Sequence, residues 1–304
     1  MRTLFLLNPT AGKADCTRTL PQQINVAAAR AGLAPEEDTI QVTNHAGHAR
    51  ELANAAAQQA RQSGEELRVF TAGGDGTFNE MVSGLMQLPE CPEVGYLPNG
   101  STNDFAASLH IPATPLKAAE SIVNGHPFYL DVGRHNDRYF AYVASFGAFT
   151  RSSYSVPQAT KNALGHFAYI LEGMKDLDSL RPYRCRVETG EETFEGEFIF
   201  GAVCNSTSLG GIMKLDPSRV QMDDGAFELL LLRMPKTAID LQSLIAAISR
   251  MDYNGPGVIF RHVQQVTVTT DEDLPWSLDG EYAPSAPRVE LRNLPGAIPL
   301  MLCR

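Results

Sequence analysis

The sequence predicts an α/β fold in which an N-terminal domain with a parallel sheet precedes a β-rich C-terminal domain. Three observations support this prediction. Short apolar runs alternate with helical segments over the first 126 residues, a pattern typical of a parallel sheet. Glycine-rich turns follow two of these runs without a spacer. Beyond residue 126 the strand signals follow one another more closely, which is typical of antiparallel pairing.

The N-terminal domain is expected to comprise residues 1–126. The second of its helices should end at Gly64, because glycine readily adopts the left-handed conformation of a helix C-terminus. Since the carboxyl ends of parallel strands share one sheet edge, the ligand-binding loops should gather there. Strands are predicted at residues 3–7, 39–43, 67–72 and 94–97, and helices at residues 17–31, 46–62, from the glycine turn to about 86, and after 105.

The C-terminal domain is expected to comprise residues 127–304, and a return of the extreme C-terminus to the first domain stays open. Asn136-Asp137 should form the turn of its first hairpin. A cleft between the two domains is the expected substrate site. Strands are predicted at residues 128–133, 139–145, 183–189, 193–203, 226–232 and 258–270, and helices at residues 159–179 and 237–250.

The most informative stretch is LRVFTAGGDGTFNE, from Leu67 to Glu80. A strand runs into Gly73-Gly74-Asp75-Gly76-Thr77 and then into a helix. Glycines let the backbone approach a ligand closely, and the free N–H groups of a helix N-terminus attract anions, so phosphate is the natural ligand. A carboxylate beside phosphate is favourable only with a divalent cation between them, so Asp75 indicates a magnesium nucleotide. A plain Asp-Gly turn is the alternative interpretation.

Two further loops fit phosphoryl chemistry. Asn8 to Lys13 follows the first strand and could hold phosphate, although it lacks the spacing of a P-loop. Asn99 to Asp104 follows the fourth strand, and the hydroxyls of Ser101 and Thr102 could bind phosphate or sugar. Capping of the next helix is the alternative for these hydroxyls.

A further cluster of interest is Asp279-Gly280-Glu281, in the turn after residues 276–278. A carboxylate at such a position is usually a solvated hairpin tip. A kinase, however, needs a base for its acceptor hydroxyl, and Glu281 is a candidate for that base.

Composition excludes several classes of protein. The net charge of −10 and the absence of a basic run argue against tight nucleic-acid binding and against passive adhesion to an anionic membrane. The five cysteines show no CxxC spacing, which fits free thiols in a reducing compartment. No apolar stretch approaches the roughly 20 residues of a membrane span. A soluble, cytoplasmic protein is therefore expected.

Five motifs, NPTAG, TAGGDGTFNE, PNGSTNDFA, MDDGAFEL and SLDGE, occur in this order over almost the whole chain. This set resembles the diacylglycerol kinase catalytic-domain family, in particular its soluble bacterial lipid kinases. The resemblance implies an N-terminal α/β nucleotide domain like those of phosphofructokinases and NAD kinases, and a C-terminal β-sandwich-like domain. It also implies transfer of the γ-phosphoryl group of ATP to a lipid hydroxyl such as that of diacylglycerol.

The same resemblance assigns roles by position. Glu281 would be the general base, with Asp279 holding it or a water. A structural Mg²⁺ would be bound by the Asp224 carboxylate and by the backbone carbonyls of Gln221 and Ala226. Many relatives have Thr where Ser101 stands, and Asn99 replaces a usual Leu, so the local pocket differs. ATP contacts would come from Asn8, Pro9, Thr10, Ala11, Gly12, Thr43, Gly73, Gly74, Asp75, Gly76, Thr77, Asn79, Glu80 and Ser101.

Two other functions stay open. The glycine loop is shared with kinases of soluble acceptors such as NAD or a sugar, although the DDG and DGE motifs favour a lipid acceptor. A catalytically silent nucleotide- or lipid-binding regulator is the second alternative, and the retained Asp75 and Glu281 argue against it. A homodimer also stays open.

Contact with a lipid would be peripheral, from the cytosol. The helical region from Tyr154 to Leu180 carries the apolar stripe best suited to it, and core packing explains the same stripe. His45 and His48 lie three residues apart at a helix start, and without a third ligand near in sequence they are interpreted as surface histidines.

Overall fold

The computed structural model describes residues 2–12, 22, 25, 26, 29, 40–101, 103–147, 180–209 and 213–303. Two compact units are present, Met1–Val132 together with Pro295–Arg304, and Gly133–Leu294. The expected helices at 17–31 and 159–179 lie almost entirely outside these residues, as does the predicted lipid-docking region apart from Leu180.

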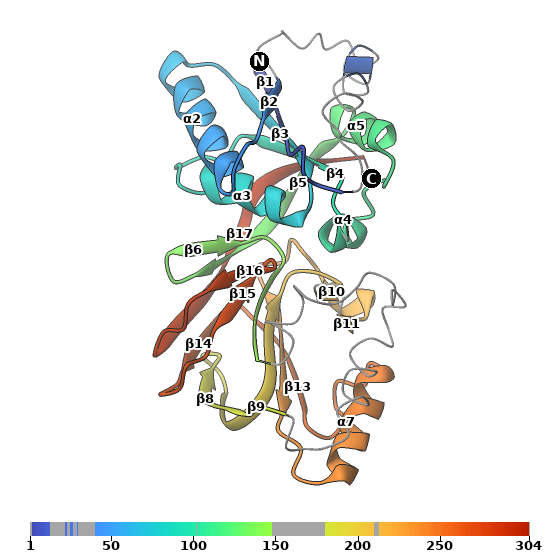
Figure 1. The fold of residues 1–304 in the computed structure, drawn as a ribbon, viewed down its shortest axis with the longest axis vertical. Helices are drawn as coiled ribbons and strands as arrows, with labels where there is room; N and C mark the ends of the chain where they lie inside the picture. Colours follow the sequence, from blue (N-terminus) through green and yellow to red (C-terminus); the bar gives the residue numbers. More distant parts are fainter. Residues whose placement is uncertain are drawn as a thin grey trace. The chain divides into compact units, whose positions relative to one another are not determined.

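The first unit is built on a parallel sheet, as predicted (Figure 1). Its strands are β1 (Arg2–Leu7), β2 (Ile40–Val42), β3 (Leu67–Gly73) and β4 (Glu93–Pro98), in the order β4-β3-β1-β2. β1 and β3 pair in parallel from Arg2 opposite Leu67 to Leu7 opposite Ala72. The end of β17 (Arg288–Leu302) adds a further parallel strand beside β4. The loops after β1, β3 and β4 therefore leave the same edge.

The helices of the first unit are α2 (His48–Ser63), α3 (Asp75–Leu85), α4 (Asp104–Ser108) and α5 (Pro115–Val123). α2 ends at Gly64, whose φ of 70° is the left-handed conformation expected there. Its buried face consists of alanines, which allow close packing. A Cβ at Gly84 of α3 would lie 2.3 Å from the Arg50 carbonyl oxygen of α2, so glycine is required at this contact.

The second unit is antiparallel and β-rich, which confirms the predicted fold class. β9 pairs with β7, β8 and β12, and β12 also pairs with β13. The alternate residues Phe227, Leu229 and Leu231 of β12 belong to one buried core. The elements are β6 (Arg138–Phe140), β7 (Val143–Gly147), β8 (Tyr183–Glu188), β9 (Thr193–Cys204), β10 (Ser208–Leu209), β11 (Met213–Lys214), η4 (Pro217–Arg219), β12 (Phe227–Arg233), α7 (Ala238–Ser249), β13 (Val258–Val263), β14 (Gln265–Thr269), β15 (Trp276–Leu278) and β16 (Glu281–Ala283).

Two strand predictions were wrong in detail, and several strands were missed. The single strand expected at residues 258–270 is two strands, because β13 pairs with β12 whereas β14 pairs with β8 and β17. The strand expected at 139–145 is interrupted at Ala141 and Tyr142, whose N–H groups donate to a side chain instead of to a neighbouring strand. β10, β11, β15, β16 and β17 were not predicted. Together with β5 (His126–His135), β17 contributes residues to both units.

No helix in the described part of the chain is both long enough and apolar enough to cross a bilayer.

Candidate functional site

The three predicted phosphate loops meet at the carboxyl edge of the parallel sheet. The Asn8 side-chain amide after β1 donates to the Thr77 hydroxyl of α3 over 2.8 Å. The Asn99 side-chain amide after β4 donates to the Ala11 carbonyl over 3.1 Å, and the Asn99 N–H donates to the Gly73 carbonyl over 2.7 Å. The loops therefore form one hydrogen-bonded assembly within the first unit.

Glycines make this assembly possible. A Cβ at Gly12, whose φ is 82°, would lie 2.3 Å from the Asn99 carbonyl oxygen. A Cβ at Gly100 would lie 2.5 Å from the Gly74 Cα, and one at Gly73 would lie 2.5 Å from the Thr77 hydroxyl oxygen. Each value is below any ordinary contact. The glycines are thus needed for the loops to touch, in addition to the expected need for close approach of a ligand.

The start of α3 presents free backbone donors. Its N-cap is Gly74, which has no side chain to accept from the first N–H groups. Unpaired N–H groups and the helix dipole make such an end attractive to an anion. Thr77 and Asn79 of this helix are buried. The Asn79 side-chain oxygen makes no hydrogen bond within the described residues.

Asp75 lies at the centre of a buried network. One carboxylate oxygen accepts from the Tyr96 hydroxyl over 3.0 Å, and the other accepts from the Asp104 N–H over 2.9 Å. Burial and the negative charge of Asp104 raise the pKa of Asp75 to about 6, against the lowering effect of its hydrogen bonds. Ionised Asp75 is therefore held in a costly environment, which a nearby cation would relieve.

Tyr96 is a site residue that the sequence analysis missed. It is fully buried in β4, and its hydroxyl donates to Asp75 and also lies 3.3 Å from the Asn103 side-chain oxygen. Burial, followed by the charge of Asp75, raises the pKa of Tyr96 well above its usual range, so the hydroxyl keeps its proton. A tyrosine within the otherwise apolar run of this strand could have indicated the role, because a buried Tyr hydroxyl needs a hydrogen-bond partner.

The remaining predicted nucleotide residues lie around the same edge. The N–H and hydroxyl of Thr10 both donate to the Asn8 side-chain oxygen. Thr43 is buried, and its N–H donates to the Leu7 carbonyl over 2.8 Å. Glu80 points to α2, where its carboxylate accepts from the N–H groups of Gly47 and Ala49. Ser101 is exposed, and the nucleotide roles of all these residues stay predictions.

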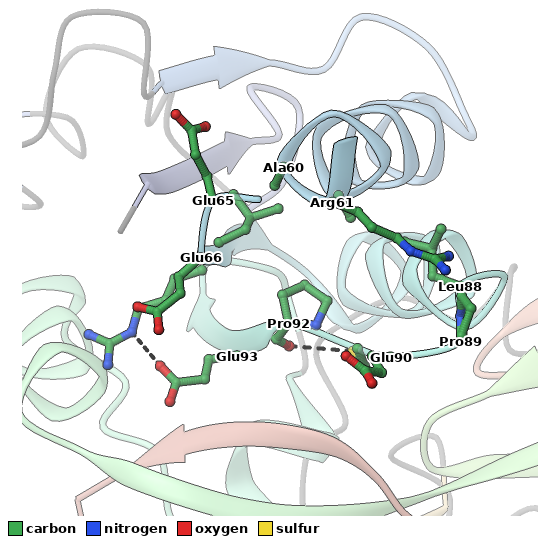
Figure 2. Close-up of a pocket in the computed structure, with 13 residues that line it drawn as sticks. Ala60, Arg61, Glu65, Glu66, Leu88, Pro89, Glu90, Pro92 and Glu93 are labelled. Carbon is green, nitrogen blue, oxygen red and sulfur yellow. Dashed lines mark hydrogen bonds and ion pairs between the residues drawn. The ribbon is translucent and has the colours of Figure 1, made fainter. Parts of the chain in front are cut away.

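A cavity of about 520 Å³ lies at the other end of the strands and does not suit the nucleotide (Figure 2). It is formed before β3 and β4 and beside the C-terminal half of α2. Its lining holds four carboxylates, those of Glu65, Glu66, Glu90 and Glu93, against the two guanidinium groups of Arg61 and Arg68. This excess of negative charge would repel a triphosphate.

In the second unit, Asp279 and Gly280 form the two-residue turn between β15 and β16. Their φ values of 50° and 89° are both positive, as a type I′ hairpin turn requires. Asp279 is buried, so the interpretation as a solvated hairpin tip does not hold for it. Its carboxylate accepts from three consecutive backbone N–H groups, those of Ala141, Tyr142 and Val143, over 2.5 to 3.0 Å.

Glu281 follows this turn as the first residue of β16. Its carboxylate is about half exposed and lies 3.8 Å from the Arg138 guanidinium. Arg138 also donates to the Tyr282 carbonyl over 2.9 Å. The strand position of Glu281 is therefore fixed by Asp279 on one side and by Arg138 on the other, while its carboxylate stays accessible to solvent.

The predicted metal residues lie in the turn before β12. One Asp224 carboxylate oxygen accepts from the Ala226 N–H over 3.0 Å, and Gly225 between them has a φ of 77°. Close by, Glu228 is fully buried, and neither of its oxygens makes a well-formed hydrogen bond within the described chain. Burial, with a further contribution from the Asp224 charge, raises the pKa of Glu228 to about 8. One Glu228 oxygen also lies 3.8 Å from His262 Nε2. The predicted ligands, the Asp224 carboxylate and backbone carbonyls, are oxygen donors of the kind that Mg²⁺ prefers.

Comparison with known proteins agrees with this architecture. Residues 2–135 match the diacylglycerol kinase catalytic domain, and residues 143–302 match the YegS C-terminal NAD kinase beta sandwich-like domain. A diacylglycerol kinase from Bacillus subtilis strain 168 is 35% identical over 94% of this chain and 91% of its own length. A diacylglycerol kinase from Staphylococcus carnosus strain TM300 is 33% identical over 94% of this chain and 90% of its own length.

A crystal structure of a diacylglycerol kinase from Bacillus anthracis strain Sterne matches 99% of this chain and 97% of its own, with a TM-score of 0.73 at 20% identity. This likeness supports the fold. The fold, together with the matched domains, defines a phosphotransferase that acts on an alcohol acceptor. The chain belongs to the diacylglycerol kinase family and is a diacylglycerol kinase-like lipid kinase.

Proposed function

We propose that this protein transfers the γ-phosphoryl group of ATP to the hydroxyl of a lipid at a membrane surface, with diacylglycerol as the first candidate. The observation that supports ATP most directly is the joined set of three loops around the uncapped start of α3. Backbone N–H groups and the Thr77 hydroxyl supply donors for phosphate oxygens. The names of the relatives support diacylglycerol as the acceptor.

Glu281 is proposed as the general base. The acceptor oxygen attacks the γ-phosphorus in line, the bond from this phosphorus to the β-phosphate oxygen breaks, and ADP leaves. The acceptor proton passes to the Glu281 carboxylate and then to solvent. An accessible carboxylate on a fixed strand suits this role, because the base must stay within hydrogen-bond reach of the hydroxyl.

Asp279 is a positioning residue in this scheme. Its three backbone hydrogen bonds anchor the turn that carries Glu281. We assign Asp75 to the nucleotide side, where Tyr96 and the Asp104 N–H orient its carboxylate. Bound Mg²⁺ would neutralise charge on the phosphates and, at the second predicted site, would be held by Asp224 with the Gln221 and Ala226 carbonyls.

The test is a phosphorylation assay with [γ-³²P]ATP and a panel of acceptors. Diacylglycerol, monoacylglycerol, undecaprenol and a glycolipid are presented in mixed micelles, and NAD and sugars are presented in solution. We expect label in a lipid product that depends on Mg²⁺. Label in NAD or a sugar alone would contradict the lipid acceptor, and ATP binding without label in any product would indicate a silent regulator.

A further inference from the structure

His45, His48 and Glu51 come together at the N-terminus of α2. One nitrogen from each imidazole and one carboxylate oxygen all lie within 4.8 Å of one another. The two rings stack with centroids 4.5 Å apart and planes 26° apart. His45 Nε2 lies 3.7 Å from a Glu51 carboxylate oxygen. Glu51 lies three residues after His48, so the expectation that no third ligand is near in sequence was wrong.

The backbone that carries the cluster is held from outside. Gly47, between the histidines, adopts a φ of 83° and serves as the N-cap of α2. Its N–H and that of Ala49 both donate to the Glu80 carboxylate on α3. The three side chains thus project from a segment whose position is set by a second helix, and a ligand would not have to order this backbone.

His45 is already oriented as a ligand. Its Nδ1 lies 2.9 Å from the Ala46 carbonyl oxygen, which can only accept, so Nδ1 carries the proton. The lone pair of the neutral ring is then on Nε2, the atom nearest Glu51. Metal-binding histidines characteristically donate their other ring N–H to a backbone carbonyl or a carboxylate in this way.

His48 has a competing partner. The Asn44 N–H donates to its Nδ1 over a long 3.2 Å. Coordination through Nδ1 displaces this donor, and coordination through Nε2 requires the proton to move to Nδ1. Either route breaks the hydrogen bond. The Asn44 amide is therefore a local reporter of occupancy.

We propose that His45, His48 and Glu51 bind a divalent transition-metal ion of the zinc class, with water completing the coordination. Two imidazoles and one carboxylate suit Zn²⁺, Ni²⁺ or Co²⁺ better than Mg²⁺, which prefers oxygen ligands. Ligand atoms in a tetrahedral site with bonds of about 2.1 Å lie about 3.4 Å apart. The observed separations of up to 4.8 Å exceed this spacing, so binding requires the exposed side chains of His45 and Glu51 to move closer to the half-buried His48.

The experiment is calorimetric titration of the full chain with Ni²⁺ and Zn²⁺, combined with amide NMR. The wild type should bind one ion of each metal at this site and shift the Asn44 amide. Metal affinity should fall at least about tenfold in each of the variants His45→Gln, His48→Gln and Glu51→Gln. Removal of a residue that only hydrogen-bonds to a metal ligand already lowers affinity by about 10-fold or more, and removal of the ligand itself should lower it further. His126→Gln and Glu65→Gln, which change exposed residues elsewhere, should bind as the wild type does.

Absence of millimolar or tighter binding by the wild type would overturn the proposal. Undiminished affinity in any one of the three cluster variants would overturn it too, since binding would then involve other groups such as the thiols.

Discussion

At the scale of single residues, the informative feature is the cost of ionised Asp75. Its neighbours act in opposite directions, since burial and Asp104 raise its pKa whereas the Tyr96 hydroxyl and the Asp104 N–H lower it. A protein that gained only stability from this position would carry an uncharged residue there. The carboxylate is therefore best explained by a function that needs its charge.

Asp75→Asn should separate stability from activity. The proton on folded Asp75 stabilises the wild type below a pH of about 4, and this contribution is lost as the pH rises through about 6. Asn does not titrate. The melting temperature of the variant, relative to the wild type, should therefore rise between a pH of about 4 and a pH of about 8. Turnover should fall by about 10²-fold or more. A variant with near-normal turnover would remove Asp75 from the mechanism.

Tyr96→Phe should move the acid limb of the pH–rate profile. The hydroxyl stabilises ionised Asp75, so its removal raises the pKa of Asp75 further above about 6, and activity is lost at a higher pH on acidification. The measurement is kcat/KM from pH 5 to 8, compared with Tyr129→Phe, which changes an exposed ring. A uniform loss of rate without a shifted limb would mean that Tyr96 only packs.

At the scale of secondary-structure elements, the turn of the β15–β16 hairpin contacts residues 141–143 through one buried side chain. The Asp279 carboxylate accepts from the N–H groups of Ala141, Tyr142 and Val143, in addition to the pairing of β15 with β7. Asp279→Ala should destabilise the protein by at least about 2 kcal/mol, because unpaired buried N–H groups cost about 1–3 kcal/mol each. Urea unfolding measures this, and Asp279→Asn, which keeps one acceptor oxygen, should lose less. Equal stability of the Ala variant and the wild type would contradict the role of the hydrogen bonds.

The turn before β12 tests the metal assignment. Mg²⁺ should raise the melting temperature of the wild type, because a ligand bound only by the folded state stabilises it. Asp224→Ala should lose this increase. Asp223→Ala, which changes the adjacent exposed carboxylate, should keep it. If both variants respond to Mg²⁺ as the wild type does, Asp224 is not a Mg²⁺ ligand.

At the scale of the whole molecule, the sequence was sufficient for what depends on local pattern. Strand–turn–helix order placed the parallel sheet and its glycine loops, because alternating apolar runs and glycine turns leave few topologies open. The strand boundaries in the second unit were harder to predict from the sequence. Residues 258–270 form one run rich in β-forming residues, and only tertiary pairing splits it into β13 and β14.

Contacts between distant residues could not be predicted at all. The three partners of Asp279 lie more than 130 residues away along the chain. Tyr96 on β4 donates to Asp75 at the start of α3, and Glu80 on α3 accepts from the backbone at the start of α2. Glu51, in contrast, lies three residues after His48, and this helical spacing was a local signal that could have been read from the sequence. The partners of Asp279 and Glu80 carry no local signature, because only the fold brings these residues together.

The kinetics of Glu281→Gln test whether Glu281 is the general base. Gln keeps the shape of the side chain but cannot take the acceptor proton, so kcat should fall by about 10²- to 10⁴-fold while ATP affinity stays within a few-fold. Glu272→Gln, at an exposed position nearby in sequence, should keep the wild-type rate. A Glu281→Gln protein that loses ATP binding but keeps its maximal rate would contradict the account, and Glu281 would then be a nucleotide contact.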